Sequence, residues 1–167
     1  MLKFLYWTFI AGCIVVLAGL AILLIIDIDS KPVGKEISET QEETSIEEQT
    51  SYIGGTTEEV TLDENSTAMD AIITMHQMTH QKVYSADKWG AVKMTPENIA
   101  KVTDFVRSIE FEQKIDMLKI LGRWERGDFS TIVEDHNYFW NIQGGNIGEA
   151  TRALTEDEEK EFIANNF

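Results

Sequence analysis

The hydrophobic and polar positions divide the chain into three stretches with different patterns. Residues 4–26 form an apolar run without a single charged side chain. Residues 27–67 contain scattered apolar residues with no helical or strand period, and residues 68–167 show apolar positions at helical spacing. The pattern predicts an apolar segment, a linker and one small folded domain, because about 100 residues suffice for a single hydrophobic core.

The apolar run from Phe4 to Ile26 is long enough to cross a bilayer. A spanning helix needs about 20 apolar residues, and this run has 23. Tyr6 and Trp7 lie near its amino end, where amphipathic rings favour the membrane interface. A lysine precedes the run and two aspartates follow it, so the positive-inside rule predicts a cytoplasmic amino terminus. We therefore expect residues 1–26 to anchor a single-pass protein in the lipid bilayer, with its carboxy-terminal domain extracytoplasmic.

Two other interpretations fit this apolar run less well. A cleaved signal peptide has a shorter apolar region and a small-residue cleavage site, which the residues around Ile26 do not provide. Residues 10–13 (IAGC) resemble the lipidation motif of bacterial lipoproteins, but 13 apolar residues follow Cys13 where polar ones are usual. The length of the run favours an uncut anchor, in which Cys13 is a small apolar residue.

Residues 27–67 are expected to form a disordered acidic linker. They contain 12 acidic residues against Lys31 and Lys35, a local net charge of −10, and are rich in Ser and Thr. Such a composition buries too little apolar surface to offset the entropy of ordering. The whole chain has a formal net charge of −15. This balance argues against nucleic acid as a partner, since nucleic-acid-binding proteins present a basic face.

From residue 68 onward, helix start and stop signals delimit the apolar stretches. Thr95 and Pro96 open one helix, and Thr155 with Glu158 forms a capping box for a last acidic helix. No stretch sustains period-two alternation. The sequence therefore predicts an all-α domain over residues 68–167, a bundle of four to five short helices. Helices are expected at about 67–82, from Pro96 onward, 111–126 and 129–143, with a turn or short helix at 147–154. At the junction Gly127-Asp128, the glycine is expected to end one helix and the aspartate to cap the next. Three tryptophans are expected to help fill the core: Trp89, Trp124 and Trp140.

Several short motifs in this part resemble a known family. They are MHQMTHQK (75–82), KWG (88–90), MTPE (94–97), RWERGDFS (123–130), EDHN (134–137) and QGG (143–145). In combination they resemble a family of uncharacterised proteins from Bacillus-type Firmicutes, which have an amino-terminal membrane helix and a small exposed domain. The resemblance covers about residues 70–165. It implies a bacterial host and a domain of unknown function, and it carries over no catalytic or binding residue.

The three histidines of the chain are the main candidates for chemistry. His76 and His80 are four residues apart and share a helix face, and His136 lies beside Asp135 on a later helix. Imidazoles with a carboxylate are ligands that zinc prefers, so these four residues are a candidate metal site. Gln77 occupies the position of the catalytic glutamate in the H-E-x-x-H metalloproteases. The histidines share their stripes with apolar residues, so the more common role, a partly buried structural histidine, fits them too.

Other residues with chemical potential have simpler explanations. Glu125, Asp128, Glu134 and Asp135 lie near predicted helix ends, where acidic residues are typical of caps rather than of a glycosidase pair. The glycine-rich stretch 144–148 follows a helix and lacks the Lys-Ser/Thr of a phosphate-binding loop. These residues therefore add no catalytic prediction.

The sequence predicts a non-enzymatic, membrane-tethered helical domain on the outer face of a Gram-positive bacterium, without a cofactor, that binds a protein or another cell-envelope ligand. A tether raises the effective concentration of such a domain near its partners. The alternative is a small metal-dependent envelope hydrolase that uses zinc at His76, His80 and His136. One distance separates these hypotheses. Imidazoles more than about 8 Å apart cannot share one ion, because Zn–N bonds are near 2 Å.

Overall fold

Three helices of the domain begin at threonine caps. In the computed structural model, which describes residues 47–167, these are α3 (Ala68–Thr79), α4 (Pro96–Ser108) and α7 (Glu156–Asn166). Each preceding threonine accepts a hydrogen bond from the backbone N–H of the third helical residue. This bond satisfies a donor that the helix itself leaves without a partner. The caps at Thr95 and Thr155 are those that the sequence predicts.

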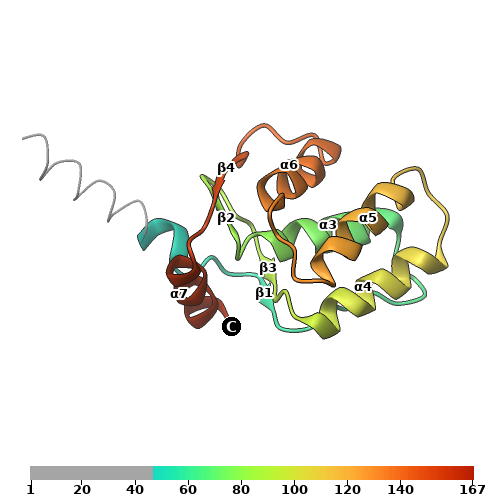
Figure 1. Ribbon diagram of the computed structural model, residues 1–167, viewed down its shortest axis with the longest axis horizontal. Coiled ribbons are helices and arrows are strands. Elements are labelled where there is room, and N and C mark those ends of the chain that lie inside the picture. The colour runs from blue at the N-terminus through green and yellow to red at the C-terminus, as the bar shows by residue number, and fades with distance from the viewer. Residues whose placement is uncertain (1–46) are drawn as a thin grey trace, which may run out of the picture. The chain divides into compact units, whose positions relative to one another are not determined.

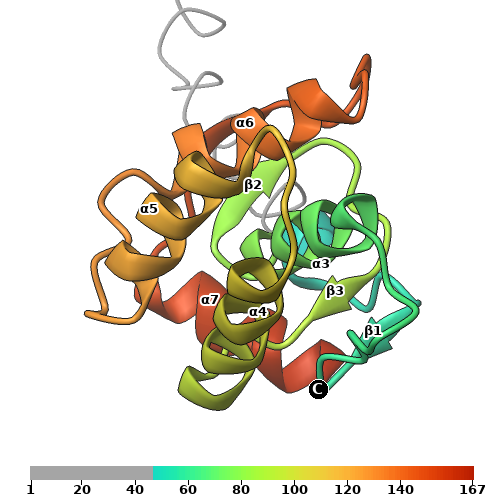
Figure 2. The same cartoon turned by 90° about the vertical axis from the view of Figure 1, so that its right-hand side faces the viewer.

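Two further helices pack around α3 and α4. They are α5 (Lys114–Trp124) and α6 (Ile132–Ile142); α3 contacts α4 and α6, and α4 contacts α5 (Figures 1 and 2). Gly127 follows α5 in the left-handed region (φ 71°), as expected of a helix terminator. The cap predicted at Asp128 is wrong, because Thr131 holds the N-cap position of α6. Asp128 instead accepts hydrogen bonds from the backbone and side chain of Ser130.

The domain also contains short strands, which the all-α prediction missed. β1 (Thr56–Thr57) pairs in parallel with β3 (Ala91–Val92), and β2 (Val83–Ser85) pairs antiparallel with β4 (Ala150–Ala153). Strands of two to four residues are too short to show a period-two pattern. β4 also replaces the turn or helix expected at 147–154. The fold is therefore helix-rich with two small two-stranded sheets.

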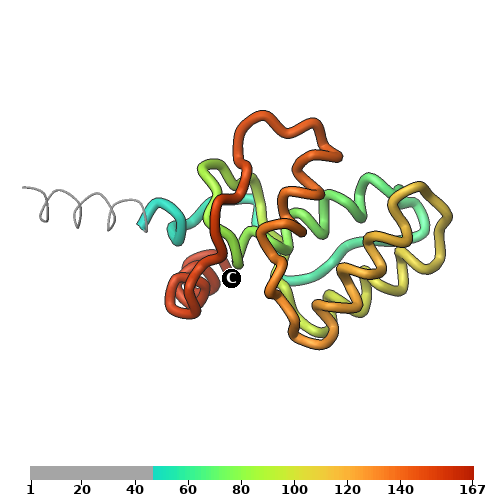
Figure 3. The backbone as a smooth tube through the Cα atoms, turned by 45° about the horizontal axis from the view of Figure 1, so that its top comes forward, coloured from blue at the N-terminus to red at the C-terminus, as the bar shows by residue number. Residues whose placement is uncertain are grey.

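Part of the predicted linker is folded against the domain. The sequence places residues 47–67 in the disordered linker, but the first residues of this segment bond to α7 and β2, and its later residues lie beside β3 and α4 (Figure 3). The Asn166 side chain accepts a hydrogen bond from the Ile53 N–H and donates one to the Ser51 carbonyl. Val60 is buried in the core. Among the described residues, the compact unit accordingly includes residues 47–67 as well as residues 68–167. Composition did not predict this folded segment, because hydrogen bonds from polar side chains, rather than an apolar run, attach most of it to the domain.

The predicted membrane anchor lies outside the described residues. This holds for residues 4–26, with Phe4, Tyr6, Trp7 and Ile26, and for residues 27–46 of the predicted linker. Within residues 47–167, no helix has the length and apolar character needed to cross a membrane. The single-pass topology and the extracytoplasmic location of the domain therefore stay predictions.

The core contains one of the three tryptophans that the sequence places there. Trp124 is 2% exposed and lies among Phe139, Leu121 and other buried side chains of the helices. Trp89, in contrast, is 78% exposed in the loop between β2 and β3, and Trp140 is half-buried on α6. The expectation that all three fill the core is wrong. The two outer tryptophans belong to a cavity described below.

Asn98 provides a sharp stability test. Its side chain is buried, donates to the carbonyl oxygens of Glu58 and Lys93 at 2.7 Å each, and accepts from the Val60 N–H at 3.2 Å. We expect Asn98→Ala to lower the free energy of unfolding by roughly 2–4 kcal/mol, because three backbone groups lose their partner in a buried setting. Urea unfolding followed by circular dichroism measures this. The matched control is Asn65→Ala at an exposed position, expected to change stability by less than about 0.5 kcal/mol; equal losses would contradict the prediction.

Candidate metal centre

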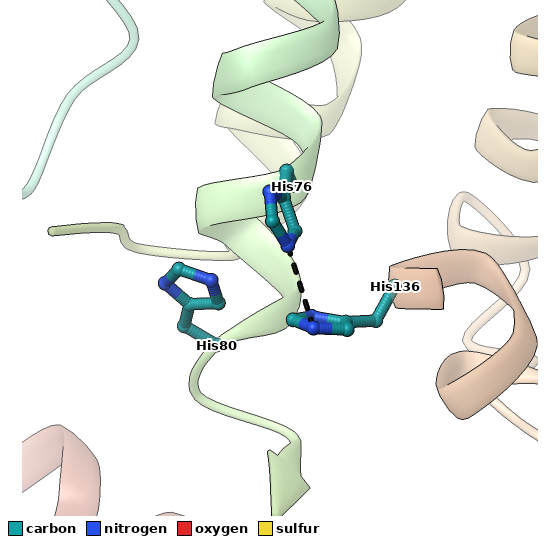
Figure 4. A group of neighbouring side chains, drawn as sticks. All are labelled: His76, His80 and His136. Atoms are coloured by element: carbon teal, nitrogen blue, oxygen red, sulfur yellow. Dashed lines mark hydrogen bonds between the residues drawn. The ribbon is translucent and has the colours of Figure 1, made fainter. Parts of the chain in front are cut away.

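The three histidines meet where the carboxy end of α3 faces α6. His76 lies in the last turn of α3 and His80 is its C-cap residue, while His136 lies on α6. The ring centroids are 4.9 Å apart for His76 and His80, 4.4 Å for His76 and His136, and 5.5 Å for His80 and His136. Figure 4 shows His136 reaching from α6 toward His76, with the His80 ring near the end of α3. All three separations lie well inside the limit of about 8 Å for sharing one ion.

Two of the rings are held through Nδ1 by the surrounding protein. The Nδ1 atom of His80 lies 2.6 Å from the Gly90 carbonyl oxygen, so this nitrogen carries the proton and Nε2 keeps its lone pair. The Nδ1 atom of His136 lies 2.8 Å from the Thr79 hydroxyl, which itself donates to the His76 carbonyl. The Nε2 atom of the same ring lies 3.0 Å from the Gly148 carbonyl oxygen, and an ion bound to Nε2 would replace this contact. Hydrogen bonds of this kind orient metal-binding histidines and select the nitrogen that faces the ion.

The Nε2 atoms of His76 and His136 lie 3.4 Å apart, along the dashed line in Figure 4. Two nitrogens bound to one tetrahedral zinc ion are about 3.3 Å apart, given Zn–N bonds of about 2.0–2.1 Å. The ligand atoms of the three histidines all lie within 4.8 Å of one another. This spread exceeds the spacing around one zinc ion by roughly 1.5 Å, so the His80 ring would have to move toward the other two to share the ion.

The surroundings of the cluster favour uncharged histidines. Burial lowers the pKa of His76, and it lowers that of His80 well below the usual value. The pKa of His136 falls to about 4, chiefly through burial and secondly through the neighbouring His76. Metal ions bind the neutral imidazole. Near pH 7 the three rings are therefore already in the charge state that a metal ion requires.

Asp135, the carboxylate predicted as a further ligand, is engaged elsewhere. Its two oxygens accept hydrogen bonds from the Arg123 guanidinium and, at 2.9 Å, from Trp124 Nε1. Successive side chains on a helix point about 100° apart, so Asp135 and His136 face different neighbours. In the part of the chain that the structure describes, the histidine cluster contains no carboxylate ligand. The structure thus brings together His76, His80 and His136 and leaves Asp135 out.

A cavity of about 360 Å³ lies against the cluster. This volume is within the range of small-molecule sites. His76 and His80 form part of its wall, whereas His136 is fully buried and is not a lining residue. An ion held by the three histidines is therefore accessible from the cavity. The lining residues are Ile73, His76, Gln77, His80, Asp87, Trp89, Trp140, Gln143, Gly145, Asn146 and Ile147.

Several residues around the cluster were not predicted from the sequence as part of the site. Thr79 and Gly90 contact histidine rings but belong to no recognisable metal motif. Gln143 belongs to the QGG motif, which the sequence explains only as a helix terminator, yet its amide lies 3.0 Å from Nδ1 of His76. Gln143 follows His136 by seven residues, or about two helical turns, and this spacing is the one sequence signal that places both side chains on the same helix face.

Gln143 provides a test of the outer contacts of the site. In the structure the Gln143 Nε2 atom faces Nδ1 of His76. When zinc binds Nε2 of His76, Nδ1 carries the proton, and the Gln143 amide must turn over so that its oxygen is the acceptor. We expect Gln143→Leu to weaken zinc binding about 10-fold, at the lower end of the usual range, because Gln143 is exposed and water can replace its amide. Gln143→Glu is expected to strengthen binding. Calorimetric titration in competition with a chelator measures both changes, and equal affinities in all three chains would contradict the prediction.

The low pKa of His136 predicts how the metal-free domain responds to acid. The folded domain keeps this ring neutral down to about pH 4, whereas the unfolded chain protonates it below about 6.5. The unfolded state binds more protons between these values, so the free energy of unfolding falls as the pH falls through this window. We expect the His136 contribution to be roughly 3 kcal/mol between pH 7 and 4. Urea unfolding at a series of pH values, with chelator present, measures it; constant stability from pH 7 to 5 would contradict it.

The fold and the cluster define a small helix-rich domain with three converging histidines beside a cavity. The chain belongs to a family of unknown function (DUF6241), whose model matches residues 75–164. This range contains all three histidines. No match was found among curated proteins or among solved structures. The predicted domain of unknown function is confirmed, while the bacterial host and the membrane anchor stay predictions.

Proposed function

We propose that this protein is a membrane-tethered, extracytoplasmic binding module of the bacterial cell envelope, and that its domain binds one zinc ion through His76, His80 and His136. The convergence of three uncharged imidazoles supports this function most strongly. Three histidines are the ligand set of zinc sites that keep one coordination position open. Imidazole also suits copper and nickel, so geometry and supply decide among these metals.

The sequence supports the location of the module. The 23-residue apolar run supplies an anchor, and the charge distribution around it favours a cytoplasmic amino terminus. Residues 1–46 fused to a reporter that is active only outside the cytoplasm are expected to give activity. An inactive fusion combined with an active cytoplasmic reporter would reverse the orientation.

Metal analysis tests the binding function. Full-length protein, purified in detergent and equilibrated with excess zinc, is expected to retain about one zinc ion per chain after gel filtration, as three histidines hold one ion. The same treatment of His80→Ala is expected to leave much less zinc. Substoichiometric zinc that is unchanged in His80→Ala would overturn the proposal.

A metal-dependent hydrolase is the second candidate, and the cavity beside His76 and His80 favours it. A zinc ion with an open position lowers the pKa of bound water to about 7 and so generates a nucleophile. The test is zinc-dependent hydrolysis of p-nitrophenyl acetate by the full-length chain, with His76→Ala as the control. A rate no higher than that of free zinc would leave the binding module as the function.

A further inference from the structure

Two tryptophans form part of the cavity wall, although this residue type is usually buried. Trp89 is 78% exposed and Trp140 is half-buried, and both line the cavity beside the histidines. Tryptophan is enriched where proteins bind their partners, because a fixed indole offers a large contact area. The exposure of Trp89 therefore indicates a role in binding a ligand rather than in packing the core.

Both indoles are held in place through their only polar atom. Trp89 Nε1 donates to the Asp87 carboxylate at 2.6 Å, and Trp140 Nε1 donates to the Ile147 carbonyl at 2.8 Å. Gly145 also lies against the Trp140 ring, since a Cβ atom on it would come within 2.2 Å of the indole. The rings therefore present apolar faces whose orientation is already set, which reduces the entropy lost on binding.

The polar side chains of the cavity wall are mainly neutral amides. Gln77, Gln143 and Asn146 line it, and an amide both donates and accepts hydrogen bonds. Asp87 is the one acidic lining residue, and it bonds to Trp89. No lysine or arginine belongs to the wall of this cavity. The wall thus offers flat apolar faces and neutral hydrogen-bonding groups, and no side chain with a fixed positive charge for a phosphate.

We propose that the cavity binds one ring of a neutral carbohydrate, with its C–H face stacked on the Trp89 indole and its hydroxyls bonded to the amides. A pyranose combines an apolar face with several neutral hydroxyls, and this is the combination that the wall matches. The Gln77 amide donates to the Trp89 carbonyl and the Gln143 amide to the Phe139 carbonyl, so these side chains are held in place while the sugar hydroxyls can bond to their oxygens. The volume of about 360 Å³ suits a single ring. This inference goes beyond the proposed metal binding and does not depend on it, because the tryptophans and amides are not among the three ligands, although Gln143 contacts His76.

Indole N–H resonances in ¹⁵N-labelled protein provide the experiment. The full-length chain is kept in a detergent without a sugar headgroup and titrated with methyl glycosides of glucose, galactose and N-acetylglucosamine. At least one glycoside is expected to shift the Trp89 and Trp140 resonances saturably. The Trp124 resonance is expected to stay in place, because this indole is buried and bonded to Asp135. No saturable shift with any of the three glycosides would overturn the proposal, as would equal shifts produced by inorganic phosphate.

Variants separate stacking from general surface effects. Trp89→Ala is expected to weaken glycoside binding by about tenfold or more, the equivalent of about 1.4 kcal/mol, whereas Trp89→Phe keeps an aromatic face and most of the affinity. The control is Tyr52→Ala, an aromatic residue of similar exposure (68%) that does not line the cavity. An unchanged Trp124 resonance verifies that each variant is folded. Equal affinity in Trp89→Ala and the unsubstituted chain would overturn the stacking model.

Titrations with zinc and with chelator distinguish this inference from the metal proposal. Glycoside shifts that persist in the presence of chelator support the carbohydrate site by itself. Zinc retention without any glycoside shift supports the metal centre and overturns the carbohydrate site. The two readouts are independent, because zinc is counted by metal analysis and the sugar by indole resonances.

Discussion

Replacing His76 with alanine is expected to weaken zinc binding by more than about 100-fold, beyond the roughly 10- to 100-fold effect of losing an outer-shell partner. The reason is geometric. The Nε2 atom of His76 lies 3.4 Å from that of His136, the separation expected of two nitrogens on one zinc ion. His80→Ala is expected to have a similar effect, since either change leaves two ligands. Calorimetric titration of the full-length chain against a chelator of known affinity measures the change.

Gln77→Ala is the matched control for the histidine variants. Gln77 follows His76 on α3 and lines the same cavity, but it is not one of the three converging ligands. Its zinc affinity is expected to stay within about 3-fold of the unsubstituted value, the equivalent of less than 1 kcal/mol. Zinc at about 100 times its Kd is also expected to raise the free energy of unfolding by about 2.7 kcal/mol, both in Gln77→Ala and in the unsubstituted protein. Equal affinities in His76→Ala and Gln77→Ala would contradict the three-histidine site.

Asp135→Ala is expected to lower the free energy of unfolding by roughly 3–5 kcal/mol, the usual cost of removing one partner from a buried charged pair. The Asp135 side chain is 4% exposed and accepts from both Arg123 and the buried Trp124 indole. Burial raises the pKa of Asp135, and these two donors oppose that rise. Removing the carboxylate therefore leaves the Trp124 N–H without an acceptor in the core.

A surface pair provides the control for this prediction. Asp116 bonds to Lys119 at 2.8 Å, with both side chains more than half exposed. Asp116→Ala is expected to cost no more than about 1 kcal/mol. Zinc stoichiometry is the second readout: it is expected to stay the same in Asp135→Ala, because this carboxylate lies outside the cluster. Loss of zinc from a folded Asp135→Ala protein would show that Asp135 is a zinc ligand after all.

Local signals in the sequence predicted the helices well. Thr95 and Thr155 cap helices through contacts within three residues, so their effect is readable from spacing alone. The strands were missed for the opposite reason. β1 pairs with β3 and β2 with β4 across long stretches of chain, and each strand is too short to carry its own pattern. The structure of residues 47–67 likewise depends on distant polar partners such as Asn98 and Asn166.

The candidate site was predictable in part. The four-residue spacing of His76 and His80 places them on one face of a helix, and the sequence alone shows this. The position of His136 next to His76 depends on how α6 packs against α3, and no local sequence pattern predicts this packing. The same packing decides that His136 faces the cluster and Asp135 faces Trp124. Trp89 was placed in the core on residue type alone, whereas its short loop between β2 and β3 leaves it in solvent.

The entry point of the chain into the domain has a mechanical consequence. Gln49 accepts from the Ser85 N–H, and Asn166 bonds to the backbone of Ser51 and Ile53. Tension applied along the chain from its amino-terminal side would first load these side-chain bonds to β2 and α7, before it reaches α3. Ser85 also donates to the Gly148 carbonyl, which lies against His136, so a load on the entry segment would reach the histidine cluster through these two contacts.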